Sequence, residues 1–223
     1  DNMYQHTTLT GEHIDLPIGK VVCVGRNYLD HIQELNNEVP AEPLLFMKPA
    51  TALCEISKPL VIPADRGECH NELEVALLIA KPLRDCSNEQ TAADALYGVG
   101  LALDLTLRDV QQKLKDKGQP WERAKAFDGA CPVSSFTPLD APADLGNLDF
   151  SLTINGDVRQ QGNTKLMMRD ALSLLCAISE VFTLQPGDIV LTGTPKGVGP
   201  LLQGDNLQLK MAPWFDIHTQ VGE

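Results

Sequence analysis

Runs of apolar residues alternate along the chain with short polar segments rich in glycine and proline. Apolar runs of four to eight residues bounded by such segments predict strands, and the longest of them predict strands buried on both faces. The sequence predicts strands at 20–25, 44–48, 75–80, 98–104 and 189–192. The predicted core is therefore built mainly from β-strands.

Two hairpins are predicted in the second half of the chain. Residues 148–154 alternate between polar and apolar, and Asn155-Gly156 is the strongest hairpin signal present, with a return strand at 157–161. A final hairpin is predicted over 201–221, with Gly204-Asp205 as its turn.

Few segments show a helical pattern. Apolar residues spaced three and four apart predict the longest helix over 166–182. Shorter helices are predicted at 26–35, at 87–96 with Ser87 as the N-cap, and at 106–117 with Gly118 as the C-cap. Residues 119–128 have no clean period and are expected to form a loop held by Trp121.

Two carboxylates one residue apart stand just before the apolar run at 75–80. Residues i and i+2 of a strand point the same way, so Glu72 and Glu74 should project side by side. Like charges at the edge of a core repel and lose hydration, so one is protonated or a cation lies between them. Asp104, after another buried strand, supplies a third oxygen, and such a set suits Mg²⁺ or Mn²⁺. Alternatively, the glutamates lie on a solvated edge and Asp104 is a turn residue.

Polar residues after the first strand supply further candidates. His31 and Glu34 are spaced i, i+3 and share a helix face, where Glu34 could orient the imidazole and His31 could take a proton from water. The alternative is a surface ion pair. Arg26 and the backbone amides at the start of this helix could bind an anion.

Two lysines and a glycine-rich loop are less specific signals. Lys48 is either a second cationic contact or, as the pattern favours, a lysine at the end of a strand. Lys125 is either a solvated surface charge or a cation that balances the carboxylates. In the loop at 193–200, the exposed amides and the Thr194 hydroxyl could hold a carboxylate.

Composition narrows the range of partners. With 18 basic and 30 acidic residues the net charge is −12, which argues against nucleic acid or an anionic membrane as a partner. An anionic substrate would need local positive charge. The six cysteines form no CxxC pair, and no apolar run approaches the roughly 20 residues of a membrane helix, so a cytoplasmic location is expected. Asp1-Asn2 ahead of Met3 is interpreted as a cloning remnant.

Taken in order, five motifs resemble the fumarylacetoacetate hydrolase family from about residue 20 to the C-terminus. The motifs are Gly25 to Tyr28 with His31 and Glu34, His70 to Glu74, Leu103 to Asp109, Trp121 to Lys125, and Leu191 to Gly199. The resemblance is to the short single-domain branch of acylpyruvate hydrolases and oxaloacetate decarboxylases or tautomerases. It implies a mixed, mostly β fold, with a β-sandwich and β-roll core and a few packed helices. A single catalytic domain at 21–223 would follow an N-terminal extension at 1–20, and the protein would be a homodimer that uses Mg²⁺ or Mn²⁺.

The resemblance also assigns roles by position. It implies that Glu72, Glu74 and Asp104 hold the metal and that His31 and Glu34 form a catalytic dyad on a lid helix. Lys125, as a catalytic cation, and Thr194 would hold the oxo-acid end of the substrate. The further candidates for substrate binding are Arg26, Arg108 and Gln111.

Three functions remain open at this point, and the first is the leading hypothesis. The first is a hydrolase or lyase that cleaves a carbon–carbon bond of a 2-oxo acid, an acylpyruvate or oxaloacetate, through a metal-stabilised enolate. The second is an isomerase or tautomerase of a 2-oxo or 2-hydroxydienoic acid, which needs only proton transfer. The third is a non-catalytic, metal-stabilised β module that binds a partner.

Overall fold

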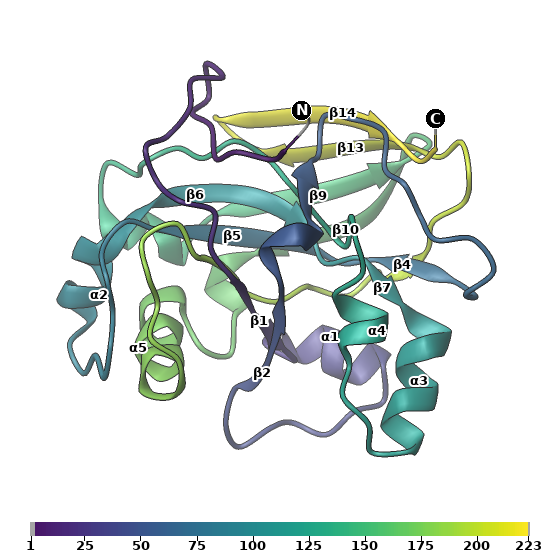
Figure 1. Ribbon diagram of the computed structural model, residues 1–223, viewed down its shortest axis with the longest axis horizontal. Helices are drawn as coiled ribbons and strands as arrows, with labels where there is room; N and C mark the ends of the chain where they lie inside the picture. The colour runs from purple at the N-terminus through teal and green to yellow at the C-terminus, as the bar shows by residue number, and fades with distance from the viewer. Residues whose placement is uncertain (1–2, 223) are drawn as a thin grey trace.

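The computed structural model describes residues 3–222 and is mostly β with a few helices, as expected (Figure 1). Asp1-Asn2, interpreted as a cloning remnant, lies outside the described residues. The largest sheet has seven strands, in the spatial order β2 (Leu44–Lys48), β1 (Val21–Gly25), β11 (Ile189–Leu191), β5 (Leu73–Ile79), β6 (Leu96–Leu103), β8 (Cys131–Val133) and β3 (Leu53–Glu55). In Figure 1, β5 and β6 run across the view whereas β1 and β2 run down it, so the sheet is strongly twisted.

Two smaller sheets complete the β structure. One has the order β10 (Asp157–Asn163), β9 (Asp149–Ile154), β13 (Asn206–Met211) and β14 (Phe215–Gln220), and the other has the order β12 (Gly199–Pro200), β4 (Cys69–Asn71) and β7 (Thr106–Leu107). The hairpin at Asn155-Gly156 is confirmed, with φ of 51° and 86° as a type I′ turn requires. The turn predicted for the last hairpin is wrong, because β13 and β14 join through residues 212–214. Asp205 instead closes a turn before β13, where its Oδ2 accepts a hydrogen bond from the amide of Leu202.

The helices are shorter than the apolar pattern suggested. They are α1 (Leu29–Glu34), α2 (Glu89–Ala95), α3 (Arg108–Asp116), α4 (Glu122–Lys125) and α5 (Ala171–Val181), with 3₁₀ turns at Ala50–Ala52, Pro142–Gly146 and Thr164–Leu166. Helix α5 begins at 171 rather than 166 because the Asp170 side chain caps it by accepting from the amide of Ser173. Helix α2 is likewise capped by Asn88 and not by Ser87.

The region around α3 and α4 contains two further corrections. Thr106–Leu107 pairs with β4 as a strand, so α3 begins two residues later than predicted. The expected loop at 119–128 contains α4, whose amides at Lys125 and Ala126 donate to the carbonyls of Trp121 and Glu122. A helix of four residues is too short to show an apolar period.

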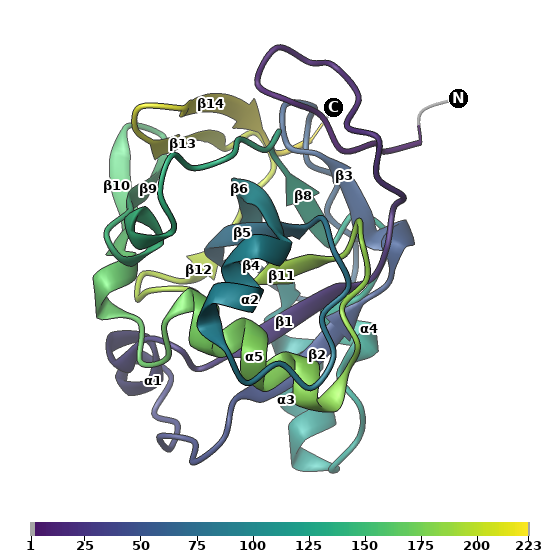
Figure 2. The same cartoon turned by 90° about the vertical axis from the view of Figure 1, so that its left-hand side faces the viewer.

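Alternation along the central strands divides the core into two faces. Leu73, Val75 and Leu77 of β5 lie in one apolar cluster, which also includes residues of α2, α5 and the four-stranded sheet. Figure 2 shows α2 in front of the central strands and α5 below it, on the same side of the molecule. Ala76 and Leu78 lie on the opposite face, in a second cluster. By alternation, Glu74 belongs to this second face.

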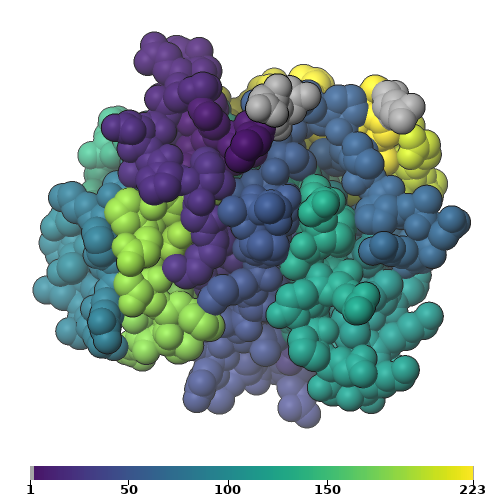
Figure 3. All heavy atoms as spheres, in the orientation of Figure 1, coloured from purple at the N-terminus to yellow at the C-terminus, as the bar shows by residue number. Residues whose placement is uncertain are grey.

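The segment at 3–20 packs against the second cluster through Tyr4, Ile14, Leu16 and Ile18. Figure 3 shows this segment, in purple, lying along the surface beside the light-green segment that contains α5. The division into an extension at 1–20 and a domain at 21–223 stays a prediction.

Among residues 3–222 the longest helix has 11 residues, too few to cross a membrane. All six cysteines are free thiols.

Candidate active site

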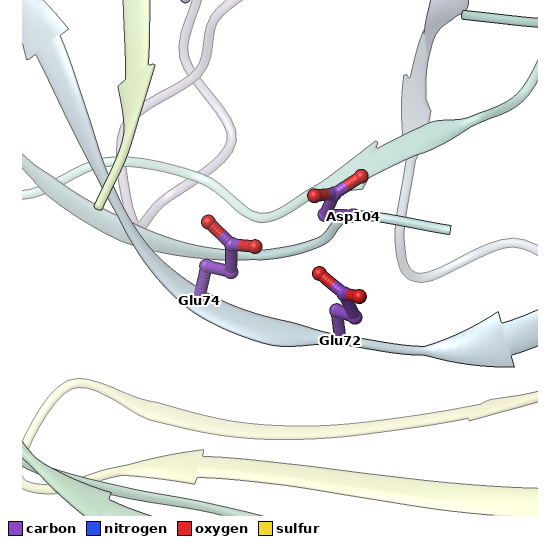
Figure 4. Close-up of side chains that lie close together, drawn as sticks. All are labelled: Glu72, Glu74 and Asp104. Atoms are coloured by element: carbon purple, nitrogen blue, oxygen red, sulfur yellow. The ribbon is translucent and has the colours of Figure 1, made fainter. Parts of the chain in front are cut away.

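Strand alternation brings three carboxylates together where the two central strands end. Glu74 is paired with Ala102 across β5 and β6, and the amide of Asp104 donates to the carbonyl of Glu72 at 2.8 Å. Glu72, Glu74 and Asp104 therefore project from the same face, and Figure 4 shows their carboxylates gathered together. One oxygen from each lies within 4.8 Å of the others, and all three residues are buried.

A divalent cation fits this set of oxygens. Two ligands of one Mg²⁺ ion lie at most about 4.2 Å apart, so small side-chain rotations are enough to bring the three oxygens to one ion. Three buried carboxylates held this close repel one another unless positive charge lies among them. All three candidate ligand atoms are carboxylate oxygens, the kind of donor that Mg²⁺ and Mn²⁺ prefer.

The carboxylates strongly affect one another. Burial, together with the charges of Asp104 and Glu72, raises the pKa of Glu74 well above its usual value, although the amide of Gly193 donates to its Oε1 at 2.8 Å. Burial also acts to raise the pKa of Glu72, but Lys125 and Arg108 outweigh it and hold that pKa well below its usual range. The structure therefore shows the competition between protonation and a neighbouring cation that the sequence spacing predicted.

Two cations contact these carboxylates from α3 and α4. Arg108 Nη2 donates to Glu72 Oε2 at 2.6 Å, and its Nη1 donates to Gln111 Oε1 at 2.9 Å. Lys125 Nζ lies 3.0 Å from Asp104 Oδ2 and 3.4 Å from Glu72 Oε1. Lys125 is therefore a buried counter-charge and not a solvated surface lysine.

Lys48 is a third cation, and the favoured interpretation of it as a strand-end lysine is wrong. Its side chain is 0% exposed, with Nζ 2.7 Å from Asp104 Oδ1. Nζ donates its hydrogens to the carbonyls of Leu105, Lys125 and Ala130, which explains why Asp104 Oδ1 receives no hydrogen bond. Alternation along β2 places Lys48 on the same face as Phe46, which packs against the second apolar cluster. This alternation along β2 was the signal in the sequence that could have placed Lys48 in the core.

A small cavity lies beside the carboxylates. Its lining includes Glu72 and six of the predicted site residues, namely Arg26, His31, Arg108, Gln111, Lys125 and Thr194. Its volume is about 30 Å³. Arg26 has a φ of 60°, a left-handed conformation that is uncommon outside glycine.

Helix α1 brings His31 to the cavity. His31 is 5% exposed, and burial lowers its pKa, so the imidazole is neutral at pH 7. Its Nδ1 lies 3.5 Å from Glu34 Oε1 but has no hydrogen-bond partner among residues 3–222. Glu34 itself does not line the cavity. Its carboxylate accepts hydrogen bonds from the amides of Gly197 and Val198, at 2.8 and 3.4 Å.

The glycine-rich loop at 193–200 does hold carboxylates, but they belong to the protein: Gly193 donates to Glu74, and Gly197 and Val198 donate to Glu34. The Thr194 hydroxyl donates to the carbonyl of Leu73 at 2.8 Å, so it offers a ligand only an acceptor.

Gln160 was missed by the sequence analysis. It is 1% exposed, and its amide nitrogen donates to Thr194 Oγ1 and to the carbonyl of Pro195. Its oxygen accepts from Asn71 and from the amide of Leu73, the two residues that flank Glu72. Gln160 therefore ties the carboxylate-bearing segment to the glycine-rich loop. In the sequence, Gln160 is a polar residue in a predicted hairpin strand, and no pattern there indicates these contacts.

A model of the "Fumarylacetoacetate (FAA) hydrolase C-terminal" family matches residues 20–222. The chain belongs to the fumarylacetoacetate hydrolase family. The oxaloacetate tautomerase YcgM of Escherichia coli is 51% identical over 218 residues, which cover 97% of each chain.

Solved structures of this family share the fold. A family protein from Yersinia pestis is 49% identical with a TM-score of 0.95, and the match covers 98% of this chain and 100% of the other. A fumarylpyruvate hydrolase from Pseudomonas aeruginosa, solved in complex with Mn²⁺ and pyruvate, is 30% identical with a TM-score of 0.91, covering 99% and 96%. The mostly β fold expected from the resemblance is thus confirmed by related structures.

Proposed function

We propose that this family member is a divalent-metal-dependent tautomerase of a small 2-oxo dicarboxylic acid, with oxaloacetate as its substrate. The observation that carries the proposal is the imidazole of His31. This imidazole is neutral, its Nδ1 has no hydrogen-bond partner among residues 3–222, and it lines a cavity that Glu72 also lines. A neutral base next to a metal site is suited to moving a proton at a carbon beside a polarised carbonyl. The identity with an oxaloacetate tautomerase supports the choice of substrate.

The charge of the site supports a dianionic substrate. The carboxylates of Glu72, Glu74 and Asp104, once ionised, are balanced by Lys48, Arg108 and Lys125. A divalent cation among these residues would leave two excess positive charges, and oxaloacetate carries two negative charges at neutral pH. Arg26 and Lys115, which also line the cavity, add further positive charge, so a dianionic substrate offsets an excess of positive charge that would be costly if left uncompensated.

Glu72, Glu74 and Asp104 are proposed to hold Mg²⁺ or Mn²⁺. When bound, the ion would polarise the 2-oxo group and stabilise the negative charge of the enolate. In the keto-to-enol direction His31 would take a proton from C3 and give it to the 2-oxo oxygen, and in the reverse direction it would take the enol proton and give it to C3. Lys125 would offset charge on that oxygen.

The remaining site residues are proposed to hold and enclose the substrate. Arg108, Gln111 and Arg26 would donate to its carboxylates, whereas the Thr194 hydroxyl, which donates to Leu73, could accept a hydrogen bond only from the hydroxyl of the enol form. Glu34 keeps α1, and with it His31, against the glycine-rich loop.

Cleavage of a carbon–carbon bond is the second candidate, supported by the likeness to a fumarylpyruvate hydrolase. Decarboxylation of oxaloacetate would use the same enolate stabilisation with loss of CO₂. Hydrolysis of an acylpyruvate would in addition need a water activated by His31 and Glu34. The two candidates therefore differ in their products and not in the metal site.

The deciding experiment measures substrate and products together with purified protein and Mg²⁺. We expect decay of the ultraviolet absorbance of enol-oxaloacetate, without stoichiometric pyruvate. Acetylpyruvate is assayed in parallel for acetate and pyruvate. Formation of pyruvate at the rate of enol decay would instead support the second candidate. Assays in Mg²⁺ and in Mn²⁺ compare the two ions.

Matched variants assign the roles. His31→Asn should lower kcat/KM by about 10² to 10⁴ with metal affinity retained, whereas Glu72→Gln should abolish metal binding. His218→Asn, at an exposed histidine, is the control and should behave as wild type. If no 2-oxo acid is turned over and His31→Asn changes nothing, the chain is a non-catalytic metal-binding module.

We also propose a homodimer, on the resemblance to the family. Strand β2 is at the edge of the seven-stranded sheet, and its residues from Leu44 to Met47 are only half-buried. Light scattering at several concentrations tests this, and a constant mass of one chain would contradict it.

A further inference from the structure

Helix α3 presents three polar side chains to the cavity along one face. Arg108, Gln111 and Lys115 are spaced i, i+3 and i+7, and all three line the cavity. Arg108 and Gln111 are at the end of the helix next to Glu72. Lys115 is seven residues after Arg108, about 10 Å along the helix axis. The face therefore leads from the carboxylates outward.

Lys115 lies among cations. Its Nζ is 5.3 Å from the centre of the Trp121 ring, and no carboxylate within residues 3–222 is close enough to pair with it. Arg26, on the segment between β1 and α1, also lines the cavity and also has no such partner in the described chain. Burial, followed by the charges of Arg26, Arg108 and Lys125, lowers the pKa of Lys115.

This arrangement is unexpected in a protein with a net charge of −12, where acidic side chains outnumber basic ones. Like charges held together without a counter-ion repel, and an anionic ligand relieves that repulsion. The inner cations already have carboxylate partners in Glu72 and Asp104. Lys115 and Arg26 are thus the cations at the cavity that remain available for an external anion.

We propose that Lys115, together with Arg26, binds the distal carboxylate of the substrate and makes the site selective for 2-oxo dicarboxylates over 2-oxo monocarboxylates. This rests on the proposed function for the inner, chelating end of the substrate. Lys115 is a specificity-determining residue, and its part is separate from the proton transfer by His31.

The competing explanation is that Lys115 only covers the Trp121 ring through a cation–π contact. A structural role of that kind would affect all ligands equally. Specific recognition would affect only those that carry a distal carboxylate. Pyruvate is oxaloacetate without that carboxylate, so the two ligands isolate the interaction.

The test compares Lys115→Met with wild type in the presence of Mg²⁺. We expect KM for oxaloacetate to rise about 10- to 100-fold, as for a lost charge-assisted contact, while kcat and inhibition by pyruvate stay within about two-fold. Lys115→Arg should restore KM. Lys113→Met is the control, because Lys113 is exposed on the same helix.

Equal changes for oxaloacetate and pyruvate, or no change for either, would overturn the inference. If wild type turns over no oxaloacetate, the proposed function fails, and calorimetry still tests Lys115. In that case, wild type should bind the dicarboxylate 2-oxoglutarate more tightly than pyruvate, and Lys115→Met should remove the preference. If Lys115→Met still binds 2-oxoglutarate more tightly than pyruvate, the role proposed for Lys115 is wrong, independently of the proposed function.

Discussion

Lys48 illustrates how one residue can hold a charged site inside a core. Burial is the largest influence and would lower its pKa, but Asp104 and the other groups around the ammonium together outweigh burial and raise that pKa, so the side chain is a cation. Three backbone carbonyls bind its ammonium and fix its position. The Lys48 ammonium therefore supplies a fixed counter-charge to Asp104 inside the core.

Removing this ammonium should be costly. Lys48→Met would leave the Asp104 carboxylate and three carbonyls without their cation, and breaking a buried pair lowers the free energy of unfolding by about 3–5 kcal/mol. Chemical denaturation at neutral pH without divalent metal measures the change. Lys58→Met removes an exposed lysine paired with Glu55 and should change stability by less than about 1 kcal/mol. Equal losses in the two variants would show that the buried ion pair contributes nothing special.

At the scale of elements, α1 is fastened to the glycine-rich loop by one side chain. Helix α1 has six residues and no side-chain N-cap, so it has little stability of its own. The hydrogen bonds from Gly197 and Val198 to Glu34 join it to the loop that follows β11. Figures 1 and 2 show α1, α3 and α4 at the same end of the molecule.

Loss of this contact should loosen α1 selectively. Glu34→Ala removes two charge-assisted bonds to a partly exposed carboxylate, worth about 1 kcal/mol after allowance for solvent. Hydrogen exchange of the amides at 29–35 should then be about five-fold faster, with β5 unchanged. Glu38→Ala, at an exposed glutamate nearby, is the control. Unchanged exchange in Glu34→Ala would contradict the fastening role.

Elements with a clear local signal could be predicted from the sequence, and those set by neighbours could not. The strand at 44–48 has the predicted bounds, and the Asn155-Gly156 hairpin is where its turn chemistry requires. The start of α5 was predicted five residues early, because apolar residues before Asp170 fit the helical stripe although that residue caps the helix. Pairing of Thr106–Leu107 with β4 is a non-local contact that no local pattern reveals.

At the scale of the whole molecule, the site joins segments that are distant in sequence. The carboxylates could be predicted, because strand alternation places Glu72 and Glu74 on one face. The cations that balance them come from β2, α3 and α4, and their approach depends on how the sheet twists. Sequence spacing holds no information on that approach, so Lys115 was not identified, and Lys48 was undervalued although alternation along β2 places it on the same face as Phe46.

A metal shared by these segments should stabilise the entire fold. Because the ion would bind the folded chain and not the unfolded one, Mg²⁺ at 100 times its Kd adds about 2.7 kcal/mol to the free energy of unfolding. For a chain of 223 residues that is an increase in Tm of about 5–11 °C. Thermal unfolding with increasing Mg²⁺ or Mn²⁺ measures this increase in Tm.

The Glu74→Gln variant should lose the increase in Tm, whereas Asp157→Asn, at an exposed aspartate in β10, should keep it. An increase that survives in Glu74→Gln would locate the ion elsewhere, because the three carboxylates that the fold brings within 4.8 Å of one another would then not be its ligands.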